Sequence, residues 1–205
     1  FQTLQGLNDS DIDYVLNTLP KFIVVKNPLA RILDVFVKHL QSTYDSNSFS
    51  EYAIEIGRYD AHDSTIFSVF RYLFNYIIWG KIDLTFEQFA RYIIDENLKN
   101  GLAPEWGRYT DHCSPCRINY TTILKAETLN YDFAPFAEHF KVDKQLTDIF
   151  SNLQSQTQPG LARKHFMTLP EAVLQSLTNV FAGDLDIFGY EHHPFFLEKR
   201  PIQYM

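Results

Sequence analysis

The sequence predicts an α/β fold in which a small parallel sheet is flanked by helices. An apolar, β-branched run at Phe22–Val25 leads directly into a stretch with helical spacing of its apolar residues, and the same order of strand and helix recurs between Ile118 and Phe140. Units of this kind place their strands parallel in one sheet. No internal repeat and no second-domain boundary is visible, so residues 1–205 are predicted to form one domain.

The first elements have clear start and stop signals. A short helix is expected after Asn8, with acidic residues in its first turn, and Leu19-Pro20 should end it. After the strand at Phe22–Val25, Asn27 is a good N-cap and Pro28 suits the first helical position. The helix that follows should reach about residue 43, with an apolar face formed by Leu29, Ile32, Leu33, Phe36, Val37 and Leu40.

The middle of the chain is more varied. Residues 42–50 are polar and aperiodic and are expected to form a loop, whereas residues 51–62 favour neither helix nor strand. Residues 65–79 predict a strongly apolar helix closed by Gly80. A second clear helix is expected from Thr85, its N-cap, with Phe86, Phe89, Ala90 and Ile93 on one face.

The second half repeats the strand and helix order after a long loop at residues 100–116. The expected elements are a strand within residues 118–123, a helix at 126–140, a linker at 151–160, a helix at 170–180 and an irregular tail from residue 192.

Composition excludes some classes of function. The chain has 205 residues, is 45% hydrophobic and carries a formal charge of −7. The negative charge argues against nucleic-acid binding as its main function. No signal peptide is visible. The most apolar stretch, residues 66–79, is interrupted by Arg71 and Asn75, which favours a core helix over a membrane span. A membrane anchor is expected only outside this chain.

The junction between the first strand and its helix predicts an anion site. Several free backbone N–H groups and the positive end of the helix should meet at the carboxyl edge of the strand. Lys26 at the strand exit and Arg31 one turn into the helix are placed to face it. The alternative is a purely structural junction, because most such junctions in α/β proteins bind nothing.

The two cysteines, Cys113 and Cys116, lie in one C-x-x-C motif. Zinc would require a second tight ligand pair, which His112 and the distant His192 and His193 do not supply, so no metal is predicted. Either a disulfide that pins the loop or two reduced thiols fits better. Asn8 and Asn119 begin glycosylation sequons, which have meaning only in the secretory pathway.

Other catalytic patterns are weak or absent. The chain contains neither of the common nucleotide-binding glycine motifs and no G-x-S-x-G elbow. Glu127 follows the second predicted strand at the start of a helix. It either complements the helix dipole or presents a carboxylate at the same edge as Lys26, where it would bind substrate or act as a base.

Four stretches together resemble one family, the Golgi carbohydrate sulfotransferases of the chondroitin/dermatan and HNK-1 type. Residues 22–34 are similar to the family's Val-Arg-x-Pro-x-x-Arg-Leu-x-Ser strand and helix start, and residues 85–89 to its Phe-x-x-Phe helix. Residues 106–128 resemble the block Trp…Cys-x-Pro-Cys…Tyr-Asp…Lys-x-Glu-Thr, and residues 186–190 the C-terminal Asp-Phe-x-x-Phe-Gly-Tyr. The order and spacing agree from about residue 20 to residue 190.

The resemblance implies a P-loop-like sulfotransferase fold whose first strand, loop and helix are missing from this chain. It implies transfer of a sulfuryl group from 3′-phosphoadenosine 5′-phosphosulfate to a sugar hydroxyl of a glycosaminoglycan or glycoprotein glycan, in the Golgi lumen and without a metal. Such in-line displacement requires cations on the donor and a base on the acceptor. Family members are type II membrane proteins.

This chain departs from the family pattern at informative positions. In the family an Arg and a Ser of the strand–helix motif hold the 3′-phosphate, and here these positions are Lys26 and Asp34, while Arg31 is retained. Lys26 keeps the charge without the bidentate fork. Asp34 places an anion near the phosphate unless Arg31 or Lys38 neutralises it. Two hypotheses therefore stand: a divergent carbohydrate sulfotransferase, or a non-catalytic relative that binds ligands or serves as a structural domain.

Overall fold

The computed structural model describes residues 6–41, 43–44, 49–57, 59, 81–99, 101–142 and 159–192. The chain divides into two compact units, one made of Phe1–Lys26 and Tyr109–Gln156 and the other of Asn27–Arg108 and Thr157–Met205. Each unit is therefore built from two separate stretches of sequence, and the prediction of one domain stays a prediction. The helix expected at residues 65–79, the first eight residues of the linker expected at 151–160 and the tail from residue 193 lie outside the described residues. The linker prediction is wrong at its last two residues, because helix α9 begins at Pro159.

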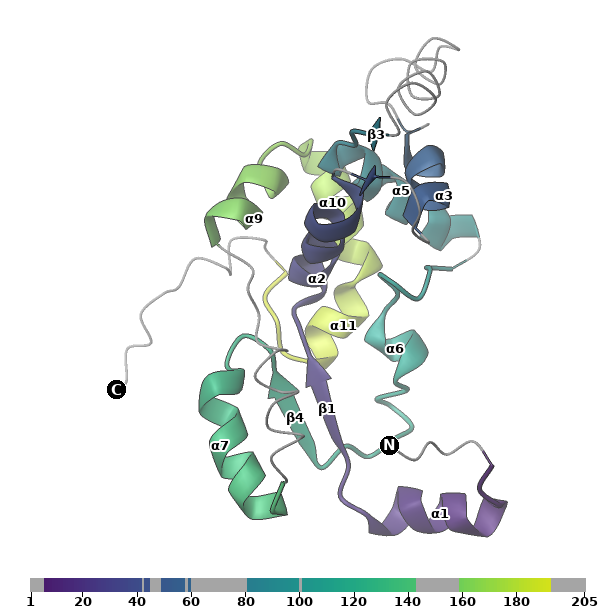
Figure 1. Cartoon of the computed structure of the whole chain (residues 1–205), viewed down its shortest axis with the longest axis vertical. Coiled ribbons are helices and arrows are strands. Elements are labelled where there is room, and N and C mark those ends of the chain that lie inside the picture. The colour runs from purple at the N-terminus through teal and green to yellow at the C-terminus, as the bar shows by residue number, and fades with distance from the viewer. Residues whose placement is uncertain are drawn as a thin grey trace. The chain divides into compact units, whose positions relative to one another are not determined.

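A two-stranded parallel sheet is the centre of the first unit. Strand β1 (Phe22–Val25) pairs with β4 (Thr122–Lys125) in a register that aligns Val25 with Lys125. Helix α7 (Leu129–Phe140) packs beside β4 (Figure 1), where Phe136 is buried with Leu124 and its ring lies edge-on to Phe22 at 4.9 Å. The small parallel sheet and the covering helix confirm the α/β prediction, while a P-loop-like topology is not seen among the described residues.

Two further helices of the first unit lie among the described residues. Helix α1 (Asp9–Thr18) begins where expected, because the Asn8 side chain accepts a hydrogen bond from the Asp11 amide at 2.9 Å. At its other end the Lys21 ammonium donates to the carbonyls of Leu16 and Leu19, at 2.8 and 3.0 Å. Helix α6 (Tyr109–His112) is a single short helix within the stretch predicted to be a loop.

Two boundaries in the first unit were predicted wrongly. Strand β4 begins at Thr122 and not at Ile118, because the preceding residues are held in a turn by bonds from Tyr120 to Cys113 and between Thr121 and Lys21. Helix α7 begins at Leu129, so residues 126–128 form a turn and not its first residues.

The described part of the second unit is mainly helical. Its elements are α2 (Pro28–Val35), the π-helix η1 (Phe36–Leu40), α3 (Phe49–Ile56), α5 (Phe86–Lys99), α9 (Pro159–Phe166), α10 (Glu171–Val180) and α11 (Ala182–Ile187), with an antiparallel pair of short strands, β2 (Thr43–Tyr44) and β3 (Lys81–Ile82). The loop expected at residues 42–50 is thus wrong at both β2 and the start of α3.

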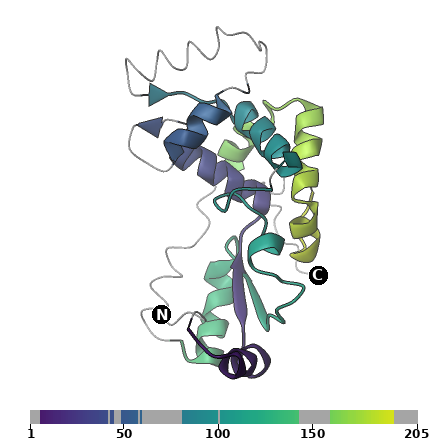
Figure 2. The ribbon, with the colours of Figure 1, turned by 90° about the vertical axis from the view of Figure 1, so that its right-hand side faces the viewer.

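Aromatic side chains fill the core of the second unit. Trp106 is fully buried and its ring lies edge-on to those of Phe89, Tyr52 and Tyr92, with centroids 5.3, 4.8 and 6.1 Å away. Its indole N–H donates to Glu96 at 2.6 Å. Helix α10 runs along α5, as Figure 2 shows, and covers the other side of this core.

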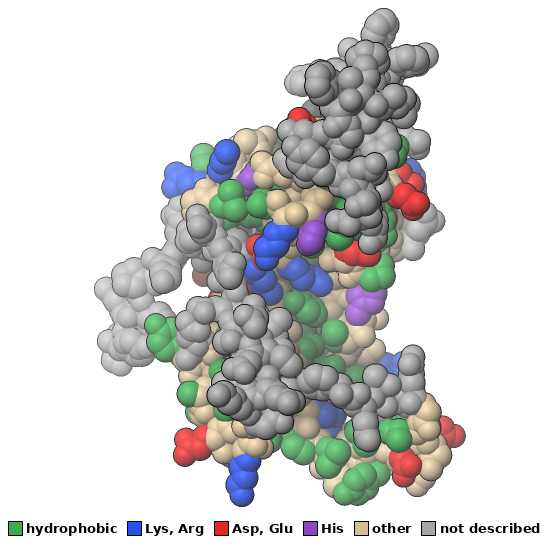
Figure 3. All heavy atoms as spheres, viewed as in Figure 1, with side chains coloured by type: hydrophobic (Ala, Val, Ile, Leu, Met, Phe, Trp, Pro, Cys, Tyr) green, Lys and Arg blue, Asp and Glu red, His purple; other side chains and the backbone are tan. Residues whose placement is uncertain are grey.

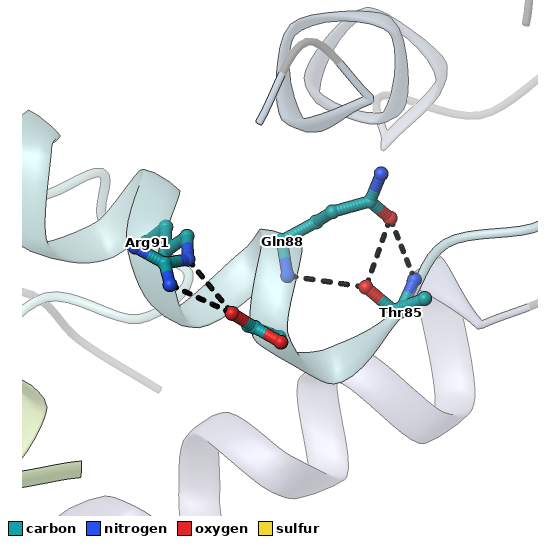
Figure 4. Close-up of polar contacts among 4 residues, drawn as sticks. Thr85, Gln88 and Arg91 are labelled. Atoms are coloured by element: carbon teal, nitrogen blue, oxygen red, sulfur yellow. Dashed lines mark hydrogen bonds and ion pairs between the residues drawn. The ribbon is translucent and has the colours of Figure 1, made fainter. Parts of the chain in front are cut away.

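Helix α5 starts with the cap that the sequence predicts. The Gln88 amide donates to the Thr85 hydroxyl at 3.2 Å, and the Thr85 amide donates to the Gln88 side-chain oxygen at 2.8 Å. Figure 4 shows this reciprocal pair beside Arg91, which binds Glu87 at 2.8 Å one turn away. The predicted face of α5 is buried, as residues Phe86, Phe89, Ala90 and Ile93.

Candidate functional site

The carboxyl edge of the parallel sheet places Lys26 and Glu127 at the same end of the first unit. Val25 pairs with Lys125, and the Ala126 amide donates to the Val25 carbonyl at 2.8 Å. Lys26 directly follows β1, whereas Glu127 follows β4 after Ala126, and both are half-buried. The parallel pairing therefore places both residues beyond the carboxyl ends of the two strands, and their roles in binding or catalysis stay predictions.

Tyr109 ties the C-x-x-C segment to this edge. Its hydroxyl accepts a hydrogen bond from the backbone amide of Lys26 at 3.0 Å. The Cys113 amide in turn donates to the Tyr109 carbonyl at 2.7 Å, and the Tyr120 hydroxyl donates to the Cys113 carbonyl at 2.8 Å. The cysteine loop thus holds the end of β1 through α6, which gives it a structural task whatever its redox state.

The start of α2, in the second unit, uses its own backbone donors. Pro28 has no N–H, the amides of Leu29 and Ala30 donate to the Asn27 side chain at 2.9 and 3.3 Å, and the Arg31 amide donates to the Asn27 carbonyl at 2.9 Å. The expectation of several free backbone N–H groups here is wrong, because the Asn27 cap accepts them. Binding of an anion at this helix would therefore depend on side chains and the helix dipole.

Arg31 and Asp34 lie one turn apart on α2. The Arg31 guanidinium is half-buried and donates to the carbonyl of Gly107, which fixes its orientation. The Asp34 carboxylate lies 3.9 Å from the ammonium of Lys38, and their side chains are 23% and 58% exposed. Lys38 therefore neutralises Asp34 in part, as expected. Figure 3 shows Lys and Arg side chains gathered over α2 on the face drawn.

The three predicted donor-binding residues are divided between the units. Lys26 belongs to the first unit, and Arg31 and Asp34 belong to the second. The supporting residues Gly107 and Tyr109 were not predicted. The Gly107 carbonyl binds Arg31 from 76 residues away in sequence, and the Tyr109 hydroxyl binds Lys26 from 83 residues away. In the sequence, only the resemblance of residues 106–128 to a family motif pointed to this segment.

An open groove in the second unit was also not predicted. It has a volume of about 420 Å³ and lies between α5 and α10, with Tyr59, Arg91, Asp95, Leu98 and Ser176 among its lining residues. The Tyr59 hydroxyl binds Asp95, and burial followed by this bond raises the pKa of Tyr59 to about 12. The lining is mainly apolar, and its two charged residues, Arg91 and Asp95, each have a partner of opposite charge on α5.

The remaining sequence hypotheses have mixed outcomes. Cys113 and Cys116 are both thiols in the structure, and their disulfide stays a prediction. Among the described residues, no group of three or more His, Cys, Asp and Glu side chains is arranged to hold a metal. None of the described helices has both the length and the apolar character of a membrane span.

Comparison with known proteins identifies relatives across nearly the whole chain. The model of the sulfotransferase family matches residues 1–191. Carbohydrate sulfotransferase 12 of Mus musculus is 25% identical over 178 residues, which are 85% of this chain and 41% of that protein. Carbohydrate sulfotransferase 14 of Danio rerio is 26% identical over 193 residues, covering 91% of this chain and 48% of its own length.

A third relative extends the match. Carbohydrate sulfotransferase 10 of Danio rerio is 23% identical over 213 aligned residues, covering 95% of this chain and 53% of its own length. The chain thus spans about half the length of the curated relatives that it matches. No solved structure is similar enough to match.

Proposed function

Because the chain belongs to the sulfotransferase family, we propose that it transfers a sulfuryl group from 3′-phosphoadenosine 5′-phosphosulfate to a hydroxyl of a glycosaminoglycan or glycoprotein glycan. The match over residues 1–191 carries this proposal, since it covers both compact units. The relatives are named carbohydrate sulfotransferases, which supports a sugar as the acceptor.

The donor's 3′-phosphate would be held by side chains, with Arg31 as the main contact. The bond to Gly107 holds its guanidinium in place, and a fixed guanidinium loses less entropy when it binds a phosphate. Lys26 would add a second positive charge, because it stands at the position of a phosphate-binding Arg in the resembled motif. Asp34 opposes phosphate binding, and Lys38 reduces that opposition.

Glu127 is the proposed general base. The bound donor supplies an activated sulfuryl group. As the acceptor oxygen bonds to sulfur, the bond from sulfur to the leaving phosphate breaks and the hydroxyl proton must go to a base. The carboxylate of Glu127 would accept that proton, since it follows β4 at the carboxyl edge and is half-buried.

A transfer assay tests the proposal directly. The full-length protein containing this chain would be incubated with radiolabelled donor and a panel of desulfated chondroitin, dermatan and glucuronic-acid-ended glycans. We expect label on at least one glycan and at least tenfold less with Arg31→Ala. Arg117→Ala, an exposed arginine of the first unit, is the charge-matched control and should retain activity.

A non-catalytic binding domain is the second candidate. Two observations favour a non-catalytic domain, because each weakens an anion site. The first amides of α2 already donate to Asn27, and Asp34 places a negative charge on the same helix. Calorimetric titration with adenosine 3′,5′-bisphosphate separates the cases. Binding without transfer to any glycan would support this candidate, whereas no binding at millimolar nucleotide would contradict the proposed donor site.

The proposed location is the Golgi lumen, with the catalytic chain held at the membrane by an anchor. Family membership supports it, since the relatives are carbohydrate sulfotransferases. A tagged full-length protein should coincide with a Golgi marker in cells and resist protease in intact vesicles. A cytosolic distribution would contradict the location without bearing on the chemistry.

A further inference from the structure

We propose that Asn119 carries an N-linked glycan, placed at the end of the first unit opposite to the proposed catalytic edge. This inference rests on the proposed lumenal location and goes beyond the proposed reaction. Of the two sequons, Asn119-Tyr-Thr121 and Asn8-Asp-Ser10, the structure favours the first.

The Asn119 side chain is presented by a turn that its neighbours hold. Asn119 is exposed, whereas the Tyr120 amide donates to the Ile118 carbonyl at 3.0 Å and the Thr121 amide donates to the Lys21 carbonyl at 2.7 Å. The Tyr120 hydroxyl donates to Cys113 on the inner side of the turn. Among the described residues, Asn119 makes no side-chain hydrogen bond that a glycan would have to break.

Within the first unit, Asn119 lies at the opposite end of the sheet from Lys26 and Glu127. Asn119 precedes the amino end of β4, while Glu127 follows its carboxyl end and Lys26 follows the aligned β1. Four strand residues at about 3.3 Å each separate the two ends by about 13 Å. A bulky, hydrophilic glycan would therefore be attached at the amino end of β4, about 13 Å from the carboxyl edge.

Asn8 has a competing structural task. Its side-chain oxygen caps α1 by accepting from the Asp11 amide at 2.9 Å, and Ser10, the third position of its sequon, already lies within α1. Asn119 caps no helix, and Thr121, the third position of its sequon, lies before β4 and outside any helix. The structure thus distinguishes two tripeptides that the sequence alone treats as equivalent.

The modification requires a defined co-reactant, an oligosaccharide linked to a polyprenyl pyrophosphate, and its transferase. The Nδ2 atom of Asn119 attacks the anomeric carbon, forming a C–N bond as the C–O bond to the pyrophosphate breaks. The pyrophosphate leaves on the lipid carrier, and an amide proton passes to a base of the transferase. No oxidation or reduction occurs.

Peptide mapping tests the proposal on the full-length protein secreted through a eukaryotic pathway. Trypsin is expected to cut after Arg117 and Lys125, so residues 118–125 contain Asn119 without Asn8. Enzymatic removal of N-glycans converts the attachment residue to Asp, which the mass of this peptide would reveal. We expect conversion at Asn119 and loss of one glycan in Asn119→Gln.

Matched variants separate glycosylation from folding. The Thr121 hydroxyl accepts from the Lys21 amide at 3.1 Å, so Thr121→Ser keeps both the sequon and this bond and should stay glycosylated. Asn8→Asp keeps a good N-cap and should leave the Asn119 glycan in place. An unmodified peptide 118–125 in protein recovered from the lumen would overturn the proposal. If that protein still transfers sulfate, the proposed function stands independently.

Discussion

At the scale of single residues, the ion pair on α2 determines how well this chain can hold a phosphate. Asp34 stands where the resembled family has a hydroxyl, and its carboxylate lies 3.9 Å from the Lys38 ammonium. Because Lys38 is 58% exposed, water screens the pair and the neutralisation is incomplete. A phosphate bound near Arg31 would therefore still meet a partly compensated negative charge.

Replacing Asp34 should strengthen nucleotide binding. Like charges about 4 Å apart repel by about 1 kcal/mol in a water-like medium, which corresponds to about a fivefold change in Kd. We expect Asp34→Ser to bind adenosine 3′,5′-bisphosphate about fivefold more tightly in calorimetric titration. Asp13→Ser, the same substitution at an exposed site on α1, is the control. Equal affinity in wild type and Asp34→Ser would mean that Asp34 does not face the nucleotide.

Glu127 should affect turnover and not donor affinity. If it is the general base, Glu127→Gln should lower kcat by about 10²-fold, a usual contribution of such a group, with the Kd for adenosine 3′,5′-bisphosphate unchanged. If it only complements the dipole of α7, kcat should be retained and unfolding should become easier by about 0.3–1 kcal/mol. Transfer assays and urea unfolding of the same variant distinguish these outcomes.

At the scale of elements, the capping box fixes where α5 begins. Two of the donors at the start of the helix are satisfied by the reciprocal bonds between Thr85 and Gln88. The cap also orients the buried Phe86 and Phe89, which pack against Phe36 of η1 at 5.3 and 6.0 Å. The start of α5 is therefore tied to the core of the second unit.

Removing the cap hydroxyl should destabilise the second unit. Thr85→Ala should lower the free energy of unfolding by about 1 kcal/mol, whereas Thr85→Ser should change it little. Glu87→Gln in the same turn breaks only a partly exposed pair with Arg91 and should cost less than about 0.5 kcal/mol. Urea unfolding measures all three, and a Thr85→Ala loss no larger than that of Glu87→Gln would contradict the role of the cap.

The elements predicted correctly are those whose signals are local. The start of α2 was predicted because Asn27 and Pro28 are adjacent to a strand and an apolar helical face. The start of β4 was missed because the turn before it depends on Lys21, which lies 100 residues away from Thr121. The residues next to Thr121 in the sequence carry no signal for such a bond.

The same limit applies to the candidate site. The sequence predicted that Lys26 and Glu127 leave parallel strands at one edge, since strand order and direction follow from the pattern. It did not predict that Gly107 and Tyr109 hold Arg31 and the end of β1. It also did not predict that the Asn27 side chain would accept hydrogen bonds from the first amides of α2. A good N-cap and an anion site at the same helix require the same donors, so the two sequence signals conflict.

At the scale of the whole molecule, the family match spans both compact units, and each unit is built from two separate stretches of chain. Unfolding of either unit would therefore disrupt segments that are far apart in sequence. In the second unit, His165 of α9 is 8% exposed and packs edge-on against the rings of Phe36 and Phe86, with centroids 5.6 and 5.7 Å away. Its buried Nε2 atom makes no hydrogen bond with the described residues.

This environment makes the stability of the second unit depend on pH. Burial, followed by the charge of Lys164, lowers the pKa of His165 below its usual value of about 6.5. The unfolded chain therefore takes up the proton first as the pH falls. The contribution of a neutral His165 is fully present above about pH 6.5 and is lost as the pH falls toward the lowered folded pKa.

Thermal unfolding between pH 8 and pH 5 tests this dependence. The Tm of the wild type should fall below about pH 6.5, and His165→Phe, or His165→Gln if the larger ring prevents folding, should fall less. Glu96 should change stability with pH in the opposite direction, because burial raises its pKa. Its contribution to stability is fully present below the pKa of the unfolded chain and is lost as the pH rises through the pKa of the folded protein. Glu96→Gln should therefore leave the His165 slope intact. An equal fall in Tm for the wild type and both His165 variants would show that His165 is not the titrating group.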